Sequence, residues 1–547
     1  MVLSTLLKNI NDSASLSYLT QYSKAYSFRA VQNIFKKIEN LNGWKLFFSC
    51  MTLLIIVRSL TLYSEVIQVD ESDFATYGAI WATGGTPYVD FVDNKPPLCY
   101  AFYAISNLLF GNNMIAVHSI MILWIAITSW FIMLLARTIG YNRAGPWAAL
   151  LYSAWTVCFP ATATLPANSE NMFNLPSAIA AYCYLKSGTT DKKNNKSILI
   201  LLAGIFIAIA SLFKHQAGIL LCVIIVHIVY EAILRQTSKW KALYDILILA
   251  CGFVIPWAIF FIYFIRHDAL SEALTYNFYN NIHYVNSHFD YARFLSRLSI
   301  RTSLFILANL PLFVCATYAC VNLKENIKWF FIFWVIGAML AVSAGGHFSP
   351  HYYVQVWPPI ILLAALGWFK ITKLEIKRWR TNLLAISFII IPLIFSSVHW
   401  WSYFSRWFEP REPVIKELTD EVIKRTSERD KIFIWGYFSY PYYFANRLPA
   451  TRFVTCQYIV PYWEKKMAGA TEFSISEMMN RHELAYKQLM DDLLKYTPKL
   501  IIDTTNSHDF TYWLPFDMKN FREYQTLVTT HYHHVKDIRG MAIYERN

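Results

Sequence analysis

The chain has 547 residues, and its 49 Lys and Arg against 36 Asp and Glu give a net charge of +13. Apolar residues make up 56% of the chain, aromatic residues 17% and charged residues only 16%. This balance excludes a disordered chain and a small disulfide scaffold, and it is typical of a membrane protein. Because the basic residues lie between apolar runs, the positive charge does not indicate nucleic-acid binding.

Apolar runs follow a polar N-terminal arm of residues 1–43, and most approach the roughly 20 residues that a spanning helix needs. We expect about eleven transmembrane helices within residues 44–400. They are predicted at 44–63, 114–136, 145–160, 171–187, 197–212, 218–234, 243–265, 302–322, 328–344, 352–369 and 382–400. Segment 96–110 is apolar but too short for a span, so we expect an interfacial helix on the outer surface there.

Lys and Arg concentrate in alternate loops, and this bias predicts the orientation of the chain. Most of them lie in the N-terminal arm and in the loops near 137–143, 186–196, 235–241, 324–328 and 370–380. We therefore expect a cytoplasmic N-terminus and, with an odd number of spans, an extracytoplasmic C-terminus. The tail ends without an ER-retention signal, which favours a bacterial plasma (inner) membrane over an ER membrane.

From about residue 401 the composition becomes mixed, as in a soluble domain. Residues 413–428 have helical periodicity. The segments KIFIWG at 431–436, KLIIDT at 499–504 and MAIYE at 541–545 are typical of short strands. We predict a small extracytoplasmic α/β domain over 401–547.

The first outer loop, residues 64–113, concentrates carboxylates beside the membrane. Asp70 and Glu71 follow the first span after only a few residues, and the two prolines after Lys95 fix a cation near the acids. Carboxylates at an apolar surface cost free energy unless they are solvated, paired or used. A solvated loop is the simple alternative to a functional site here.

Further polar groups are expected on the same outer face. Glu170 begins a span, as either a favourable charge at a helix N-terminus or a second functional acid. Lys214 and His215 interrupt an apolar run at its turn, as a solvated hairpin or as a site for a phosphate group. His351 and Tyr352 follow a Gly pair in the last outer loop. A histidine four residues before His351 matches zinc spacing on helices, but the prolines and glycines there argue against a helix.

The stretch DESDFATYGAIWATGGTPYVDFVDNKPPLCYAF, residues 70–102, resembles the first outer loop of the GT-C fold glycosyltransferases. It is most similar to the branch that uses polyprenyl-phosphate sugars, with protein O-mannosyltransferases and bacterial lipid A aminoarabinose transferases. The shared pattern is Asp-Glu after the first span, a Gly-x-Pro-Tyr turn, and Lys-Pro-Pro-Leu opening a surface helix. Weaker matches are Ser169-Glu170, Lys214-His215-Gln216, His351-Tyr352-Tyr353 and the tail segment 432–453.

The resemblance implies a membrane glycosyltransferase, hexosyl or pentosyl. Its donor would be a sugar on undecaprenyl or dolichyl phosphate, and its acceptor a hydroxyl of a glycan, lipid or protein at the outer face. Asp70 is implied as general base, with Glu71 positioning the loop or acceptor and Glu170 as a second acid toward acceptor or metal. The groups implied to bind the donor phosphate or sugar are Lys95, Lys214, His215, His351 and Tyr352.

Elementary chemistry agrees with these roles. A glycosyl transfer needs a carboxylate to take the acceptor proton and cations to hold the departing phosphate. No set of metal ligands is readable, so no cofactor is assigned and a divalent metal stays open. Arg58, near the outer end of the first span, is expected to snorkel to the interface.

A polytopic transporter or lipid flippase is the alternative function, and a non-catalytic scaffold is a second rival. Transporters tend to place ionisable groups near the bilayer midplane. The polar clusters of this chain are instead predicted at one face of the membrane, which favours chemistry at the surface.

Overall fold

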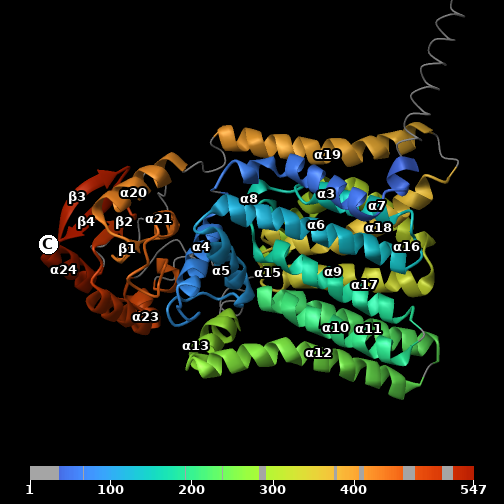
Figure 1. The fold of residues 1–547 in the computed structure, drawn as a ribbon, viewed down its shortest axis with the longest axis horizontal. Helices are drawn as coiled ribbons and strands as arrows, with labels where there is room; N and C mark the ends of the chain where they lie inside the picture. Colours follow the sequence, from blue (N-terminus) through green and yellow to red (C-terminus); the bar gives the residue numbers. More distant parts are fainter. Residues whose placement is uncertain are drawn as a thin grey trace, which may run out of the picture.

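The computed structural model describes residues 36–65, 67–190, 192–236, 238–282, 291–374, 378–405, 412–459, 475–507 and 521–547. Most of them lie in apolar helices that run side by side, and a small sheet with its own helices lies at one end of this bundle (Figure 1). Most of the predicted N-terminal arm, residues 1–43, falls outside the described residues.

The bundle is built from helices in chain order. They are α3 (Gly43–Val57), α6 (Met114–Thr138), α7 (Gly145–Trp155), α9 (Ser169–Ser187), α10 (Lys193–Phe213), α11 (Ile219–Leu234), α12 (Lys239–Arg266), α15 (Tyr291–Ala308), α16 (Leu310–Asn322), α17 (Glu325–Ser343), α18 (Trp357–Ile371) and α19 (Arg378–Phe404). Glycines allow close crossings between some of them. A Cβ added at Gly204 of α10 would overlap the carbonyl oxygen of Leu249 in α12, so only glycine permits this approach.

Six helical stretches among the described residues are long and apolar enough to span a membrane. The helices α15 and α16, bent by 88° at their junction, would make a seventh. These stretches coincide with predicted spans, whereas the predictions at 44–63, 145–160, 171–187 and 328–344 meet the helices α3, α7, α9 and α17, which are shorter or more polar. The predicted number of eleven is therefore not confirmed.

Helix α9 shows why length and hydropathy miss part of the bundle. Nearly all of its side chains are buried between other helices, including Asn171 and Asn174. The side-chain amides of these residues donate to the carbonyl oxygens of Thr164, Pro166 and Val354. A helix enclosed by protein needs no continuous apolar surface, so its sequence does not carry the usual signal of a span.

The first outer loop folds into two helices, α4 (Val69–Ala82) and α5 (Leu98–Phe110). They pack tightly, because a Cβ at Gly78 would lie 2.6 Å from the Cβ of Tyr103. The predicted helix at 96–110 is confirmed as α5. Its last turns expose apolar side chains, with Leu108 at 69% and Phe110 at 57% exposed. The position of α5 at the membrane interface stays a prediction.

Residues 412–547, which we name the C-terminal unit, hold a four-stranded sheet of order β1-β2-β4-β3. β1 and β2 are parallel, and the other two pairs are antiparallel. Its elements are α20 (Glu412–Arg425), β1 (Ile432–Trp435), α21 (Tyr440–Phe444), α23 (Ile475–Tyr496), β2 (Leu500–Asp503), α24 (Arg522–His531), β3 (Tyr532–Ile538) and β4 (Met541–Arg546).

The helix predicted at 413–428 and the three predicted strands are confirmed by α20, β1, β2 and β4. Strand β3 was not predicted. It lies at the edge of the sheet, and its polar sequence YHHVKDI buries mainly its two ends, so no hydrophobic alternation marks it. The extracytoplasmic location of this unit stays a prediction.

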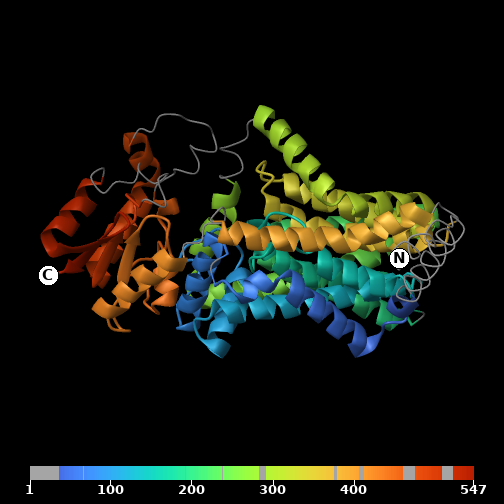
Figure 2. The same ribbon diagram turned by 90° about the horizontal axis from the view of Figure 1, so that it is seen from above.

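The first outer loop lies between the bundle and the C-terminal unit. Figure 2 shows the same order from above, with the sheet at one end, α4 and α5 next, and the bundle beyond. Hydrogen bonds cross this junction: the amide of Val92 donates to the carbonyl oxygen of Arg452, and the Asn112 side chain donates to the carbonyl oxygen of Tyr443. The first outer loop therefore contacts a part of the C-terminal unit that is far from it in sequence.

Candidate functional site

Asp70 is the most accessible acid of the first turn of α4, where a negative charge is favoured by the helix dipole. Its carboxylate is part-exposed. One oxygen, Oδ1, accepts from the hydroxyl of Tyr437 in the C-terminal unit at 3.2 Å. The other, Oδ2, accepts from the side-chain amide of Gln68 at 3.3 Å. Both bonds are long, which leaves Asp70 able to accept a further, shorter hydrogen bond.

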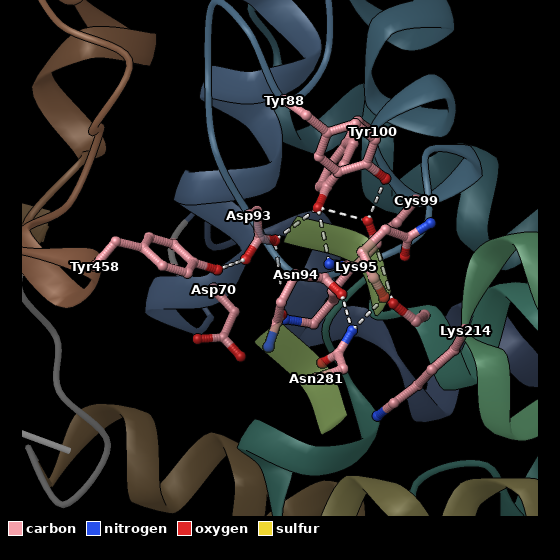
Figure 3. Close-up of polar contacts among 12 residues, drawn as sticks. Asp70, Tyr88, Asp93, Asn94, Lys95, Cys99, Tyr100, Lys214, Asn281 and Tyr458 are labelled. Carbon is pink, nitrogen blue, oxygen red and sulfur yellow. Dashed lines mark hydrogen bonds and ion pairs between the residues drawn. The ribbon is translucent and has the colours of Figure 1, made fainter. Parts of the chain in front are cut away.

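Asp93 and Lys95 lie next to Asp70 (Figure 3). Asp93 is buried and accepts from the hydroxyls of Tyr100 and Tyr458, each at 2.8 Å. The ammonium of Lys95 lies 4.0 Å from Asp93 Oδ2, and its side chain is 29% exposed. Burial opposes the charge of Lys95, but the carboxylates of Asp93 and Asp70 outweigh it and hold the pKa of Lys95 above its ordinary value. Lys95 is thus a permanent cation that still reaches solvent.

Asp73, one turn after Asp70 on α4, is a further acid of this group. It is buried and accepts a hydrogen bond from the hydroxyl of Ser439, which also contacts the hydroxyl of Ser72. Burial raises the pKa of Asp73 well above its ordinary value, against the lowering effect of the Ser439 bond, and the nearby carboxylates add to the rise. Asp73 therefore holds a proton more readily than an ordinary aspartate.

A second charged group comes from three other elements. Asn168 caps α9, accepting from the amide of Asn171 at 3.0 Å, and this places Glu170 in the first turn. Lys214, at the end of α10, donates to Glu170 Oε1. Its ammonium also lies 4.0 Å from the ring centroid of Tyr352 in η4 (Pro350–Val356).

The Glu170 pair is buried, with side-chain exposures of 2% for Glu170 and 13% for Lys214. Burial alone would raise the pKa of Glu170, but the charges of Lys214 and His351 hold it below its ordinary value. The ring of His351 packs edge-on against Tyr352, with centroids 4.6 Å apart. Four of the predicted site residues, Glu170, Lys214, His351 and Tyr352, thus gather in one cluster.

His215 does not join that cluster. Its Nε2 faces the backbone and side-chain oxygens of Asn277, at 3.0 and 2.7 Å, and its ring stacks on Trp257 with centroids 5.7 Å apart. These rings border an apolar groove between α10, α12 and the short turns His215–Gly218 and Thr275–Tyr279. It is lined by Ser211, His215, Gly218, Phe253, Trp257, Phe261 and Phe278.

Glu71 also lies apart from Asp70, because it points into the protein and is 1% exposed. Its Oε1 accepts from the amide of Ala167 at 2.6 Å and lies 3.1 Å from Nε2 of His118. The other nitrogen of His118 donates to the carbonyl oxygen of Thr61, since a carbonyl can only accept. The contact with Nε2 then needs a second proton, on the ring or on the carboxyl group. Glu71 therefore joins α4 to α6 and to the turn before α9.

Two arginines have structural partners. Arg58 is 1% exposed and donates to the carbonyl oxygens of Thr156, Thr164 and Leu165, so the expectation that it snorkels to the interface is wrong. It satisfies backbone oxygens where the chain leaves α7. Arg452 pairs with Asp492 of α23 at 3.0 Å.

Among the described residues, no group of three or more His, Cys, Asp or Glu is placed to hold a metal ion. Asp70, Asp73 and Asp93 accept instead from hydroxyls, and Asp93 also faces Lys95. Three of those hydroxyls, on Tyr437, Ser439 and Tyr458, come from the C-terminal unit. Sequence reasoning missed them: the tail segment 432–453 resembled bacterial relatives, but nothing in its residues pointed to the first loop.

Comparisons with known proteins agree with this architecture. A family model described as dolichyl-phosphate-mannose-protein mannosyltransferase matches residues 94–260. The structure of ArnT from Cupriavidus metallidurans bound to undecaprenyl phosphate is similar, with 13% identity, a TM-score of 0.58, and coverage of 91% of this chain and 97% of that one. Apo ArnT has 12% identity, a TM-score of 0.56, and coverage of 90% and 97%. No curated protein sequence matches the chain.

A weaker similarity, to the Archaeoglobus fulgidus oligosaccharyltransferase with Zn and sulfate, has 12% identity, a TM-score of 0.47, and coverage of 92% and 73%. The chain thus has the fold of ArnT over nearly its whole length. The predicted resemblance to GT-C glycosyltransferases that use polyprenyl-phosphate sugars is confirmed. The apolar helices and this fold make the chain an integral membrane protein.

Proposed function

We propose that this protein is a membrane glycosyltransferase that moves a sugar from a polyprenyl phosphate to a hydroxyl acceptor, with Asp70 as general base. One observation carries the proposal: a part-exposed carboxylate lies beside the cation Lys95 at one end of a bundle with the ArnT fold. The donor is an undecaprenyl- or dolichyl-phosphate hexose or pentose. The acceptor is a glycan, lipid or protein.

In the proposed reaction, Asp70 takes a proton and the leaving phosphate keeps an electron pair. The acceptor oxygen forms a bond to the anomeric carbon, and its proton passes to Asp70. The bond from that carbon to the phosphate oxygen breaks, and the phosphate keeps the electron pair. Lys95, held charged by Asp93 and still reaching solvent, stabilises the developing phosphate charge.

The second cluster supports the donor side. Lys214 is paired with Glu170 and lies against the ring of Tyr352. These contacts fix the direction of its ammonium group, while part of the side chain stays exposed. Glu170 then acts through Lys214 and not on the acceptor proton. His351 and Tyr352 form the wall of this donor side. The apolar groove is lined in part by His215, which directly follows Lys214 in the sequence. Its apolar lining suits an isoprenoid tail.

Of the two roles expected for Glu71, positioning the loop or positioning the acceptor, this proposal keeps the first. Since it is buried against Ala167 and His118, it fixes α4 in place and does not contact the acceptor. No step of the reaction is assigned to a metal or other cofactor. We further propose a cytoplasmic N-terminus, a catalytic region over 44–400, and an extracytoplasmic domain over 401–547, in a bacterial plasma membrane.

A transporter or lipid flippase is not favoured. In transporters, ionisable groups and substrate sites tend to lie near the membrane midplane. In this chain the groups around Asp70 lie at the bundle end that contacts the C-terminal unit (Figure 1).

The test is release of free polyprenyl phosphate from a panel of undecaprenyl- and dolichyl-phosphate hexoses and pentoses. Purified protein in lipid receives each donor with an extract of cell-envelope glycans, lipids and proteins as acceptor. Asp70→Asn keeps the side-chain volume but loses basicity, and it should abolish release. Asp90→Asn is the matched control, because Asp90 lies in the same loop and, among the described residues, accepts only from the amide of Thr86. Absence of release from every donor with folded wild-type protein, or equal rates for Asp70→Asn and wild type, would overturn the proposal.

A further inference from the structure

We infer that the C-terminal unit completes the site with two positioning residues, Tyr437 for the base Asp70 and Tyr458 for Asp93, which orients Lys95. This inference rests on the proposed function. It assigns a catalytic purpose to a part of the chain whose sheet lies well away from the membrane helices (Figure 2).

Both tyrosines are directed by the end of strand β1. Gly436 follows β1 with a φ of +132°, and a Cβ there would overlap the hydroxyl oxygen of Thr504 in the neighbouring chain segment. This sharp exit sends the following residues, with Tyr437, toward α4. The amide of Cys456 donates to the carbonyl oxygen of Gly436 at 3.0 Å, which ties the turn that carries Tyr458 to the same point. One rigid strand end therefore sets the position of two hydroxyls.

Tyr437 determines where the charge of Asp70 lies. Its hydroxyl donates to Oδ1 at 3.2 Å, so the opposite oxygen is left to Gln68 and to an incoming acceptor. Burial and the nearby carboxylates Asp70 and Asp73 raise the pKa of Tyr437 well above its ordinary value, so the hydroxyl keeps its proton and donates. Hydrogen bonds at catalytic groups are often long before the substrate arrives.

Tyr458 acts on the reaction indirectly, through Asp93 and Lys95. Asp93 accepts from Tyr458 on Oδ1 and from Tyr100 on Oδ2, each at 2.8 Å (Figure 3). These two hydroxyls come from opposite sides and fix the plane of the carboxylate. Lys95 lies 4.0 Å from Oδ2, at a distance where a small rotation of Asp93 changes the direction of the ammonium. Loss of Tyr458 should therefore affect the donor and not the base.

The same junction offers a matched control. The hydroxyl of Tyr443 donates to the side-chain oxygen of Asn107 in α5 at 2.9 Å. Like Tyr437 and Tyr458, it joins the C-terminal unit to the first loop through a phenol. Unlike them, it bonds to no acid in the part of the chain that the structure describes. Tyr443→Phe therefore removes an equivalent junction bond without touching the proposed site.

The experiment measures kcat, donor KM and the pH–rate profile for Tyr437→Phe, Tyr458→Phe and Tyr443→Phe, with the polyprenyl-phosphate sugar that the panel identifies. For Tyr437→Phe we expect kcat about tenfold lower with donor KM unchanged, since a hydrogen bond to a charged group is lost. The acidic limb of the profile should move to higher pH, because the carboxylate loses a donor that favours its charged form. For Tyr458→Phe we expect donor KM to rise about threefold to tenfold with little change in the acidic limb.

The pH–rate profile depends on Asp70 and on the titratable groups near it. The titratable groups that interact with Asp70, apart from Tyr437, are Asp73, Tyr77, Lys95, Tyr103, His351 and Tyr352. None of them is altered by the three substitutions. The position of the limb does not depend on the amount of folded protein, so it stays decisive where a variant expresses poorly.

Each outcome separates the two proposals. Wild-type protein without donor turnover refutes the proposed function itself. Wild-type turnover with Tyr437→Phe and Tyr458→Phe indistinguishable from Tyr443→Phe refutes the positioning role and leaves the function intact. Equal loss of kcat in all three variants, with an unmoved acidic limb, reduces the tyrosines to docking contacts and also overturns the inference.

Discussion

The buried pair of Glu170 and Lys214 makes a quantitative prediction about stability. Glu170→Gln leaves the ammonium of Lys214, only 13% exposed, without its carboxylate. Breaking a buried pair costs about 3–5 kcal/mol, because one charge stays desolvated and uncompensated. The ring of Tyr352, 4.0 Å from the ammonium, offsets part of this loss. We expect a net loss of about 2–3 kcal/mol after that offset and the partial exposure of Lys214.

The double variant separates the pair from its members. Lys214→Met alone leaves Glu170 buried and unpaired, with only 2% exposed, and should cost as much or more. Glu170→Gln with Lys214→Met removes both charges and should be less destabilised than the sum of the two single variants. Glu231→Gln is the control. It breaks a pair whose arginine, Arg235, is 59% exposed, and it should cost under about 1 kcal/mol.

The assay is equilibrium or thermal unfolding of the four variants and wild type in one detergent or lipid, followed between about pH 3 and pH 8. Lys214 and His351 hold the pKa of Glu170 below its ordinary value, so this group contributes stability above pH 4.5 that is lost as the pH falls through its folded value. Glu170→Gln should lack that acid-side loss. Strictly additive losses in the double variant, or an unchanged acid-side profile in Glu170→Gln, would refute the reasoning.

Three further predictions concern other parts of the molecule. The raised pKa of Asp73 means that stability falls as the pH rises from 3.8 toward the folded value, so Asp73→Asn should raise the melting temperature at neutral pH and flatten this dependence; a lower melting temperature would contradict it. Lys95→Met should raise donor KM about tenfold or more with a smaller effect on acceptor KM, measured by polyprenyl-phosphate release, and an unchanged donor KM would remove Lys95 from the donor site. Gly204→Ala should cost about 1–3 kcal/mol or prevent folding, because the new methyl meets the carbonyl of Leu249, whereas Gly188→Ala has its nearest contact at 3.4 Å and should be tolerated in the same unfolding assay.

Much of the fold could be predicted from local patterns in the sequence. Long apolar runs predict membrane helices because the bilayer allows no unpaired backbone groups, and the helices α6, α10, α11 and α12 follow those runs closely. Strands β1 and β2 were predictable for a similar reason, since all their side chains are buried and their sequences are apolar except for Asp503 at the end of β2. The turn before Lys95 was readable from its Gly and Pro residues.

The roles of the acids could not be read in this way. Asp70 and Glu71 are consecutive, and side chains one residue apart on a helix point about 100° away from each other. Only the packing of α4 decides that Asp70 faces the site and Glu71 faces His118. The dense acidic loop looked like a single cluster, yet the structure divides it into the part-exposed Asp70, the exposed Asp90 and three buried acids, Glu71, Asp73 and Asp93.

The residues that hold those acids are set by tertiary structure alone. Tyr437 and Asp70 are 367 residues apart, and Tyr458 and Asp93 are 365 apart. No periodicity or spacing rule links positions so distant, because their meeting depends on how a strand end in the C-terminal unit docks on α4. Apolar runs, grouped acids and short motifs predicted a membrane bundle, a charged first loop and the family that the chain resembles. Which carboxylate can take a proton, and which hydroxyls hold it in place, was decided by long-range packing, since burial and hydrogen bonding exist only once the chain has folded.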